Sequence, residues 1–275
     1  MTASWERIAQ APNSCAHFLE FDRAAERRAG VNAGRFLFGV LRTGGIAVAI
    51  ATSRTASGIL SQIERMGHDP AEAMKSGRLV LHESTQMLAR FTDVGAVDAQ
   101  LFDRCVGVEM RQACERAGSR PVRAFGDMVG VLWQRGDREQ AVALETFWAT
   151  LQQELGFALF CTYPIDVFAQ TYSADALRGV FATHTHVVQA ASRADLGRVL
   201  DLAMDEVLGP QAAQVRSQIR ALPMQPLPPM PKAEQIILWM RGHMPEAAEA
   251  VLARARELCE GSAPRVYLHE QHSRG

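Results

Sequence analysis

Histidine, cysteine and carboxylate side chains are the groups in this sequence that could carry out chemistry, and their spacing limits which chemistry is available. His17, His82, His184 and His186 could together ligate a metal ion, but the sequence has no HExxH motif and no paired CxxC motifs. We therefore predict neither a metal site nor a bound cofactor. His184 lies in the apolar stripe of a predicted helix, which favours a hydrogen-bonded core histidine, whereas His186 is expected to be exposed.

The sequence also lacks the usual signatures of nucleophilic and nucleotide chemistry. It contains no GxSxG motif, and Cys161 lies in an apolar predicted strand, where burial raises the pKa of a thiol. It contains no GxxxxGK[ST] loop, and the turn after the first predicted strand has no glycine until Gly30. We therefore predict no catalytic residue and disfavour an ATPase.

Residues 122–164 offer a candidate ligand site. They predict a strand, a turn at Asp127, two helices separated at Gly136, and a second strand that is almost entirely apolar. Because ligands of open α/β sheets bind at the carboxyl ends of the strands, we expect the side chains at these turns to line a cleft.

The side chains predicted to line this cleft are Phe125, Asp127, Trp133 and Tyr163. Asp127 could equally be a turn residue or a helix cap, and Trp133 and Tyr163 could equally belong to the core. Trp148 has the spacing of a core position on its helix, and we assign it to the core.

Helices alternate with strands through the first two thirds of the chain. This order predicts an α/β fold with a parallel sheet that carries helices on both faces. The five predicted strands are 15–21, 46–51, 78–82, 122–125 and 157–163. Asp22, Ser53 and Asp98 are predicted capping residues, and Asp69 and Ser84 are predicted to begin helices.

The composition changes in the last third of the chain. A helix from Ser173 to about Val188 and another at about 193–208 precede a proline-rich connector. Two short helices follow, at about 232–241 and 245–260. The predicted organisation is a lead-in at 1–14, an α/β domain at 15–192, a helical extension at 193–221, the connector at 222–231, and C-terminal helices with a tail at 232–275.

Composition excludes several classes of protein. The 275 residues are 48% hydrophobic and 21% charged, with a formal net charge of −1, so no basic surface indicates nucleic-acid or membrane binding. The odd number of cysteines, 5, suits a reducing compartment. No signal peptide or membrane span is apparent, and we predict a soluble cytoplasmic protein.

Several short motifs, taken in order, resemble one known family. They begin with His17 and Phe21 in the first strand and continue with Gly44–Gly45 before IAVAIAT. The later motifs are GRLV at 77–80, FGDMVGVLW at 125–133, LETFW at 144–148, FALFCTYP at 157–164 and HTH at 184–186. From about Cys15 to Val188 the chain resembles the MEDS domain, a sensory domain of methanogen and methylotroph regulators and of a dichloromethane-responsive repressor.

The resemblance implies a three-layer, RecA-like fold similar to circadian-clock ATPases but without the nucleotide-binding loop. The sequence departs from the family pattern at Asp127, where glutamate is more usual, and at Asp22, where an aromatic residue is common. The family is often fused to a DNA-binding or kinase module, and no such module is recognised in this sequence.

We therefore expect a non-catalytic sensor that binds a small, apolar or one-carbon-type metabolite and signals to a kinase, a transcription factor or a second copy of itself. The candidate ligand-binding residues are His17, Phe21, His82, Phe125, Asp127, Trp133, Tyr163 and His184. The alternatives are a ligand-free interaction protein that uses the C-terminal helices around Trp239, and a residual nucleotide-binding ATPase.

Overall fold

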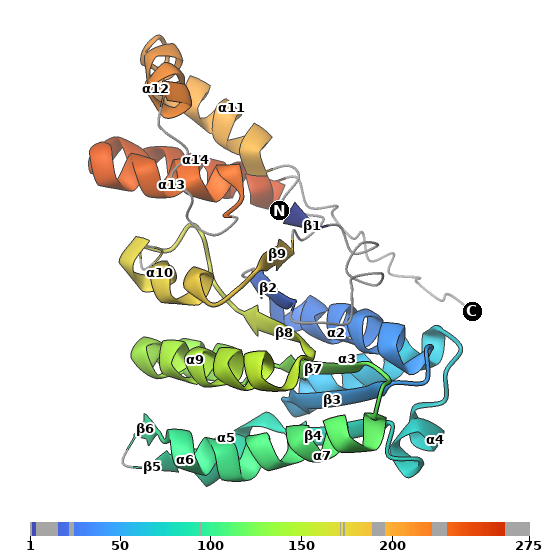
Figure 1. Cartoon of the computed structure of the whole chain (residues 1–275). Coiled ribbons are helices and arrows are strands. Elements are labelled where there is room, and N and C mark those ends of the chain that lie inside the picture. Colours follow the sequence, from blue (N-terminus) through green and yellow to red (C-terminus); the bar gives the residue numbers. More distant parts are fainter. Residues whose placement is uncertain are drawn as a thin grey trace, which may run out of the picture.

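The fold was determined from a computed structural model, which describes residues 2–3, 16–21, 25–93, 95–170, 172, 174–188, 196–221 and 230–261. A parallel sheet forms its middle layer, and helices cover both faces of the sheet (Figure 1). This arrangement confirms the predicted α/β class.

The sheet has the strand order β1-β9-β2-β8-β7-β3-β4 among the described residues, and every neighbouring pair is parallel. Its strands are β1 (Thr2–Ala3), β2 (His17–Phe21), β3 (Ile46–Ala51), β4 (Leu79–Glu83), β7 (Val122–Gly126), β8 (Ala158–Tyr163) and β9 (His186–Val188). A separate antiparallel ribbon pairs β5 (Thr92–Asp93) with β6 (Ala96–Val97).

The helices connect these strands and then continue beyond the sheet. In the first two thirds of the chain they are α2 (Ala25–Leu41), α3 (Ser53–Arg65), α4 (Pro70–Lys75), α5 (Ser84–Phe91), α6 (Ala99–Phe102), the π-helical turn η1 (Asp103–Gly107), α7 (Val108–Ala117), α8 (Met128–Arg135), α9 (Arg138–Leu155) and α10 (Ala174–Ala182). The C-terminal helices are α11 (Leu196–Leu208), α12 (Gln211–Ala221), α13 (Lys232–His243) and α14 (Pro245–Gly261).

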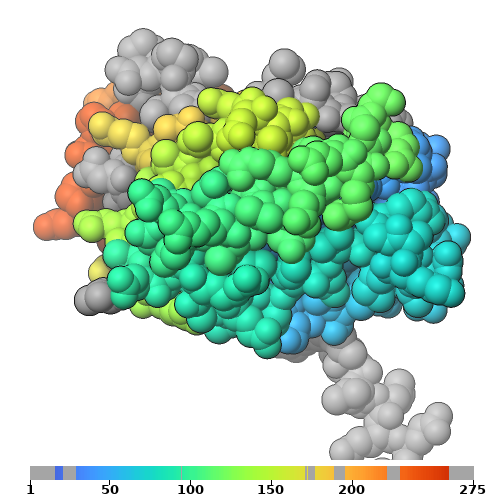
Figure 2. All heavy atoms as spheres, turned by 60° about the horizontal axis from the view of Figure 1, so that its bottom comes forward, coloured from blue at the N-terminus to red at the C-terminus, as the bar shows by residue number. Residues whose placement is uncertain are grey.

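Alternate residues of each central strand face different helical layers. In β3, Ile46, Val48 and Ile50 pack with the helices of the middle and the end of the chain, whereas Ala47 and Ala49 pack with α2 and α3. Figure 2 looks onto the side on which the middle of the chain, in green, forms the surface. Because both faces of the sheet are covered, β3 and β8 are buried along their whole length, as their apolar sequences predict.

Most helix starts match the sequence pattern. The carboxylates of Asp69 and Asp98 accept backbone N–H bonds and cap α4 and α6. The cap of α3 is Thr52 and not Ser53, because the Thr52 hydroxyl accepts the backbone N–H of Thr55 and Ser53 is already the first residue of the helix. Asp22, another predicted cap, and Ser173, a predicted helix start, lie outside the described residues.

The segment at 184–188 corrects the sequence prediction. The apolar spacing of Val180, His184, Val187 and Val188 predicted one continuous helix, but α10 ends at Ala182 and the chain then forms β9. A short apolar run is compatible with the residue spacing of a helix and with that of a strand. Pairing of β9 with β1 and β2 stabilises the strand. The lead-in also supplies a strand, β1, while the rest of 1–14 and Cys15 lie outside the described residues.

The C-terminal helices extend the hydrophobic core past the β9 side of the sheet (Figure 1). Arg241 of α13 donates hydrogen bonds to the carbonyl oxygens of Phe168, Ala169 and Tyr172 at 3.1, 2.7 and 2.8 Å. The loop after β8 is therefore the docking point for α13. The predicted connector is described only at Met230 and Pro231, and the tail after Gly261 lies outside the described residues. No described helix combines the length and the apolar character that crossing a membrane requires.

Helices α2 and α3 cross at two glycines. A Cβ atom on Gly58 would lie 2.9 Å from the Cα atom of Gly30, so neither residue can be larger without separating the helices. We expect Gly58→Ala to lower the free energy of unfolding by about 1–3 kcal/mol through overpacking. Gly242→Ala is the matched control, because a Cβ atom there would have nothing within 4 Å, and it should gain about 0.5–1 kcal/mol. Chemical denaturation followed by circular dichroism measures both; equal effects would contradict the close crossing.

Candidate functional site

A cavity of about 230 Å³ opens at the carboxyl ends of the central strands. The chain leaves β3 at Thr52, β7 at Asp127 and β8 at Pro164, and each of these residues contributes to the cavity wall. The complete lining is Ala29, Thr52, Arg54, Thr55, Asp127, Gly130, Val131, Gln134, Thr162 and Pro164. Parallel strands bring their ends together at one edge, so this position is the one expected for a ligand site in an α/β fold.

Asp127, which follows β7, is held in the wall of the cavity by groups that follow two other strands, β3 and β4. Its carboxylate accepts the backbone N–H of Thr52 at 3.0 and 3.1 Å and the Thr52 hydroxyl at 3.1 Å. It also accepts a hydrogen bond from the hydroxyl of Ser84, the first residue of α5. The side chain makes no capping bond to α8, so the structure favours the cleft interpretation of Asp127 over the helix-cap interpretation.

The Asp127 carboxyl is 7% exposed, and burial raises its pKa above the ordinary value of 3.8. The hydrogen bonds from Ser84, Thr52 and Thr55 act in the opposite direction because they stabilise the charged form. A polar ligand donor would add to this set of hydrogen bonds. The cavity therefore presents an oriented acceptor rather than an uncommitted negative charge.

The other side chains predicted for the cleft lie elsewhere. Phe125 is fully buried on the α2 side of the sheet, with its ring centroid 5.5 Å from that of Phe160. Trp133 is 9% exposed on the opposite side, and its ring meets the Tyr163 ring edge-on at 5.6 Å. Phe125, Trp133 and Tyr163 do not line the cavity. The structure thus gives the cavity threonine, aspartate and glutamine walls in place of the expected aromatic rim.

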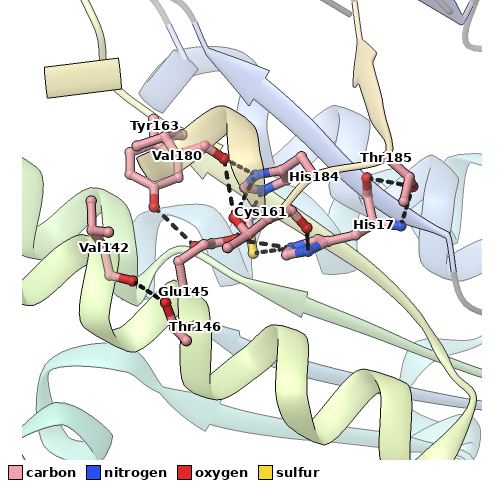
Figure 3. Close-up of polar contacts among 10 residues, drawn as sticks. His17, Val142, Glu145, Thr146, Cys161, Tyr163, Val180, His184 and Thr185 are labelled. Carbon is pink, nitrogen blue, oxygen red and sulfur yellow. Dashed lines mark hydrogen bonds and ion pairs between the residues drawn. The ribbon is translucent and has the colours of Figure 1, made fainter. Parts of the chain in front are cut away.

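A second polar cluster lies wholly inside the protein, between β2, β8 and α9 (Figure 3). It joins three predicted residues, His17, Tyr163 and His184, to Glu145 of α9. One carboxylate oxygen of Glu145, Oε1, lies 2.9 Å from the Nε2 atoms of both histidines, and the other accepts the Tyr163 hydroxyl at 2.9 Å. The Cys161 sulfur lies 3.5 Å from Nε2 of His17.

The side-chain groups of this cluster are removed from water. The side chains of His17, Glu145 and His184 are 0% exposed, and the two imidazole centroids lie 3.9 Å apart. Successive side chains of a strand point to opposite faces of the sheet, and this alternation along β2 and β8 directs His17, Cys161 and Tyr163 to the same face, toward α9. His184 reaches them from the loop between α10 and β9, so the predicted core histidine is confirmed as buried.

Burial and mutual charge set the ionisation of the cluster. Burial and the neighbouring charge of His184 lower the pKa of His17 below 6.5, and burial raises the pKa of Cys161 well above 9.0. Burial would raise the pKa of Glu145, but the charge of His184 and hydrogen bonds from both histidines outweigh it and hold that pKa below its usual value. The thiol and phenol are therefore neutral, and the carboxyl is ionised at neutral pH.

These shifts predict a pH dependence of stability. The unfolded chain protonates His17 near pH 6.5, before the folded chain does, so stability is complete above that pH and is lost as the pH falls. The lowered pKa of Glu145 likewise contributes stability that is lost as the pH falls below 4.5. The raised pKa of Asp127 has the opposite effect, because the stability it contributes is lost as the pH rises. We expect the wild type to lose about 1 kcal/mol between about pH 7.5 and 5.5, and His17→Gln to lose less, as measured by urea denaturation. An equal loss in both proteins would contradict this assignment.

The remaining predicted residues do not join either cluster. His82 lies on β4 at the edge of the sheet, with Nε2 3.5 Å from Glu109. Phe21 ends β2, and its side chain lies outside the described set. His186 begins β9, is partly exposed, and packs against Phe18 at 5.0 Å between ring centroids.

Sequence reasoning missed Glu145, Thr52 and Ser84. Glu145 carries a signal that could have been recognised, because it occupies a buried position of α9 beside Leu144 and Trp148, and a carboxylate there requires partners. Thr52 and Ser84 follow directly on strands, at the positions where ligand-site residues collect.

Comparison with known proteins gives one family. Residues 22–185 match the family model described as MEDS, the methanogen/methylotroph, DcmR sensory domain. The match contains α2 to α10 and the strands from β3 to β8, and hence all the described residues that line the cavity. No curated protein matches the chain significantly.

Proposed function

The chain belongs to the MEDS family of sensory domains, and from that premise we propose that it is a non-catalytic sensor that binds a small organic molecule in the Asp127 cavity. The observation that carries the proposal is that Thr52 and Ser84, which follow two different strands, hold the carboxylate of Asp127 in the cavity wall. A buried carboxylate held by hydroxyl and backbone donors is already oriented, so ligand binding loses little free energy in ordering it.

The cavity wall limits the kind of ligand. At about 230 Å³ it is smaller than the 300–1,000 Å³ typical of sites for drug-sized molecules. Six of its ten lining side chains are polar or charged, among them Asp127, Gln134 and Thr162. The lining favours a small molecule with at least one hydrogen-bond donor over the purely apolar metabolite that the sequence suggested.

A short path connects this cavity to the C-terminal helices. Thr162 and Pro164 line the cavity, and the loop that follows pairs Asp166 with Arg256 of α14 at 3.2 Å. The same loop accepts the hydrogen bonds of Arg241. A ligand that moves Pro164 would displace the loop on which α13 and α14 dock, so we propose these helices as the output surface for a regulatory protein or a second copy of the chain.

We also propose that the domain is a RecA-like fold that has lost nucleotide chemistry. In support, Asp127 follows β7, which is adjacent to β3, and bonds to Thr52, which links β3 to its following helix, where a phosphate-binding loop would lie. That segment reads Ala51–Thr52–Ser53–Arg54, without the glycines and lysine of such a loop. ATP with magnesium should give no turnover.

The test is a thermal-shift screen of small alcohols, amines, amides and carboxylic acids. A solute at 100 times its dissociation constant should stabilise the wild type by about 2.7 kcal/mol, or roughly 5–10 °C. Val131→Phe fills the cavity and should abolish the shift, whereas Val108→Phe, at a 42% exposed position outside it, should keep the shift. A solute that shifts Val131→Phe as it shifts the wild type would refute this site.

A further inference from the structure

We propose that His17, Glu145, Cys161 and His184 form a buried binding site for a divalent transition-metal ion, of which Zn²⁺ is the best fit. Each residue offers one ligand atom, and the four atoms lie within 4.8 Å of one another. Figure 3 shows both imidazoles and the sulfur directed at the Glu145 carboxylate. The site lies apart from the cavity and does not depend on the proposed sensing function.

Hydrogen bonding by the two histidines carries the proposal. Nδ1 of His17 lies 2.8 Å from the carbonyl oxygen of Thr183, and Nδ1 of His184 lies 2.5 Å from that of Val180. A carbonyl oxygen only accepts, so each Nδ1 must carry its proton, and each neutral ring then directs the lone pair of Nε2 outward. Both lone pairs meet the same carboxylate oxygen, Oε1 of Glu145, at 2.9 Å.

The lone pairs of the two Nε2 atoms and of Oε1 of Glu145 repel one another, so these three acceptors need a positive charge between them in the absence of water. A proton on each Nε2 would supply it, but two charged imidazole rings would then lie 3.9 Å apart between centroids, in repulsion and without water. A metal ion supplies it without protonating either ring, because the neutral imidazole Nε2 is the ligating form. Oε1 of Glu145 and Nε2 of His184 are buried, and Oε1 lies 2.9 Å from Nε2 of both histidines, as neighbouring ligand atoms would.

The spacing and the charge suit a tetrahedral zinc site. Bond lengths of about 2.0–2.3 Å place neighbouring ligand atoms of a tetrahedron roughly 3.3–3.7 Å apart. The separation of 3.5 Å from His17 to Cys161 lies within that range, and the 2.9 Å from Glu145 to each histidine is a few tenths of an ångström shorter. A divalent ion with one thiolate, one carboxylate and two neutral imidazoles has no net charge, which is the least costly state for a buried site.

The surrounding contacts are those of a closed structural site. The carbonyl oxygens of Thr183 and Val180 hold the two rings through Nδ1, and the Tyr163 hydroxyl holds the second oxygen of Glu145. All four ligand residues are buried, so no position is open to a substrate. The metal would lock β2, β8, α9 and the loop before β9 together.

The test uses the full chain without an affinity tag. The protein is unfolded with chelator and refolded with one equivalent of Co²⁺ or Zn²⁺, since a buried site fills as the chain folds. We expect one metal ion per chain by mass spectrometry, a higher melting temperature, and a near-ultraviolet thiolate-to-cobalt band. Cys161→Ser should lose that band, while Cys114→Ser, on α7 and outside the cluster, should keep it.

Either of two results would overturn the proposal: wild type that refolds without retaining metal, or a cobalt spectrum unchanged in Cys161→Ser. If Cys161→Ser does not fold, X-ray absorption of the cobalt-loaded wild type decides. A shell of one sulfur and three nitrogen or oxygen atoms supports the site, and a shell without sulfur refutes it.

Tyr163 acts on this site as a positioning residue. Tyr163→Phe removes only the hydroxyl that holds Oε2 of Glu145, and we expect metal affinity to fall about 10–100-fold while the thiolate-to-cobalt band remains. Competition with a metal-binding dye measures the affinity. Unchanged affinity would show that the hydroxyl does not orient the carboxylate.

Discussion

Glu145→Ala is expected to lower the free energy of unfolding of the metal-free protein by about 3–5 kcal/mol, because it leaves His17 and His184 buried without their common partner. The Tyr163 hydroxyl also loses its acceptor. This loss is a large fraction of the stability of an ordinary domain, which is about 5–15 kcal/mol. Urea denaturation after chelator treatment, at about pH 7.5, measures it.

Glu154→Ala is the control on the same helix. Glu154 is 53% exposed in its ion pair with Arg111, and a surface pair of this kind contributes about 0–1 kcal/mol. If the two variants lost similar stability, the Glu145 cluster would not be a structural centre of the protein. Glu145→Gln separates shape from charge: it keeps the size of the side chain but removes the negative charge that faces the two imidazoles, and it should lose stability too.

Trp148→Ala is expected to cost about 3–5 kcal/mol, the largest effect of any core truncation we predict. Trp148 is 0% exposed and meets the rings of Phe102 and Phe157 edge-on, at 5.5 and 6.4 Å between centroids. Its ring also lies 3.7 Å from the point that a Cβ atom on Gly126, directly before Asp127, would occupy. Truncation would therefore open a cavity beneath the cleft as well as remove apolar contact.

Trp239→Ala removes the same side chain from a half-buried position on α13, where the ring stacks on His243 at 4.8 Å. We expect less than half the effect of Trp148→Ala, since less apolar surface is lost from contact. Far-ultraviolet circular dichroism follows both transitions without relying on tryptophan fluorescence. Equal losses would place Trp239 in the core and contradict its described exposure.

Local patterns alone identified the parts of the fold in which sequence and structure agree. The apolar runs of β3 and β8, the left-handed glycine at Gly136 that separates α8 from α9, and the start of α14 at Pro245 each follow from nearby residues. The burial of Trp148 follows from its helical spacing. The same patterns carried the resemblance to the family that the chain belongs to.

Only the tertiary structure decided where the functional groups lie. His17, Glu145, Cys161 and His184 lie far apart in the sequence, and the pairing of β2 with β8 and β9, together with the packing of α9, brings their polar atoms within 4.8 Å of one another. The same pairing turned 186–188 from a predicted helix into a strand. Asp127 was singled out from the sequence, but Thr52 and Ser84, which hold its carboxylate, follow other strands whose order no local pattern specifies.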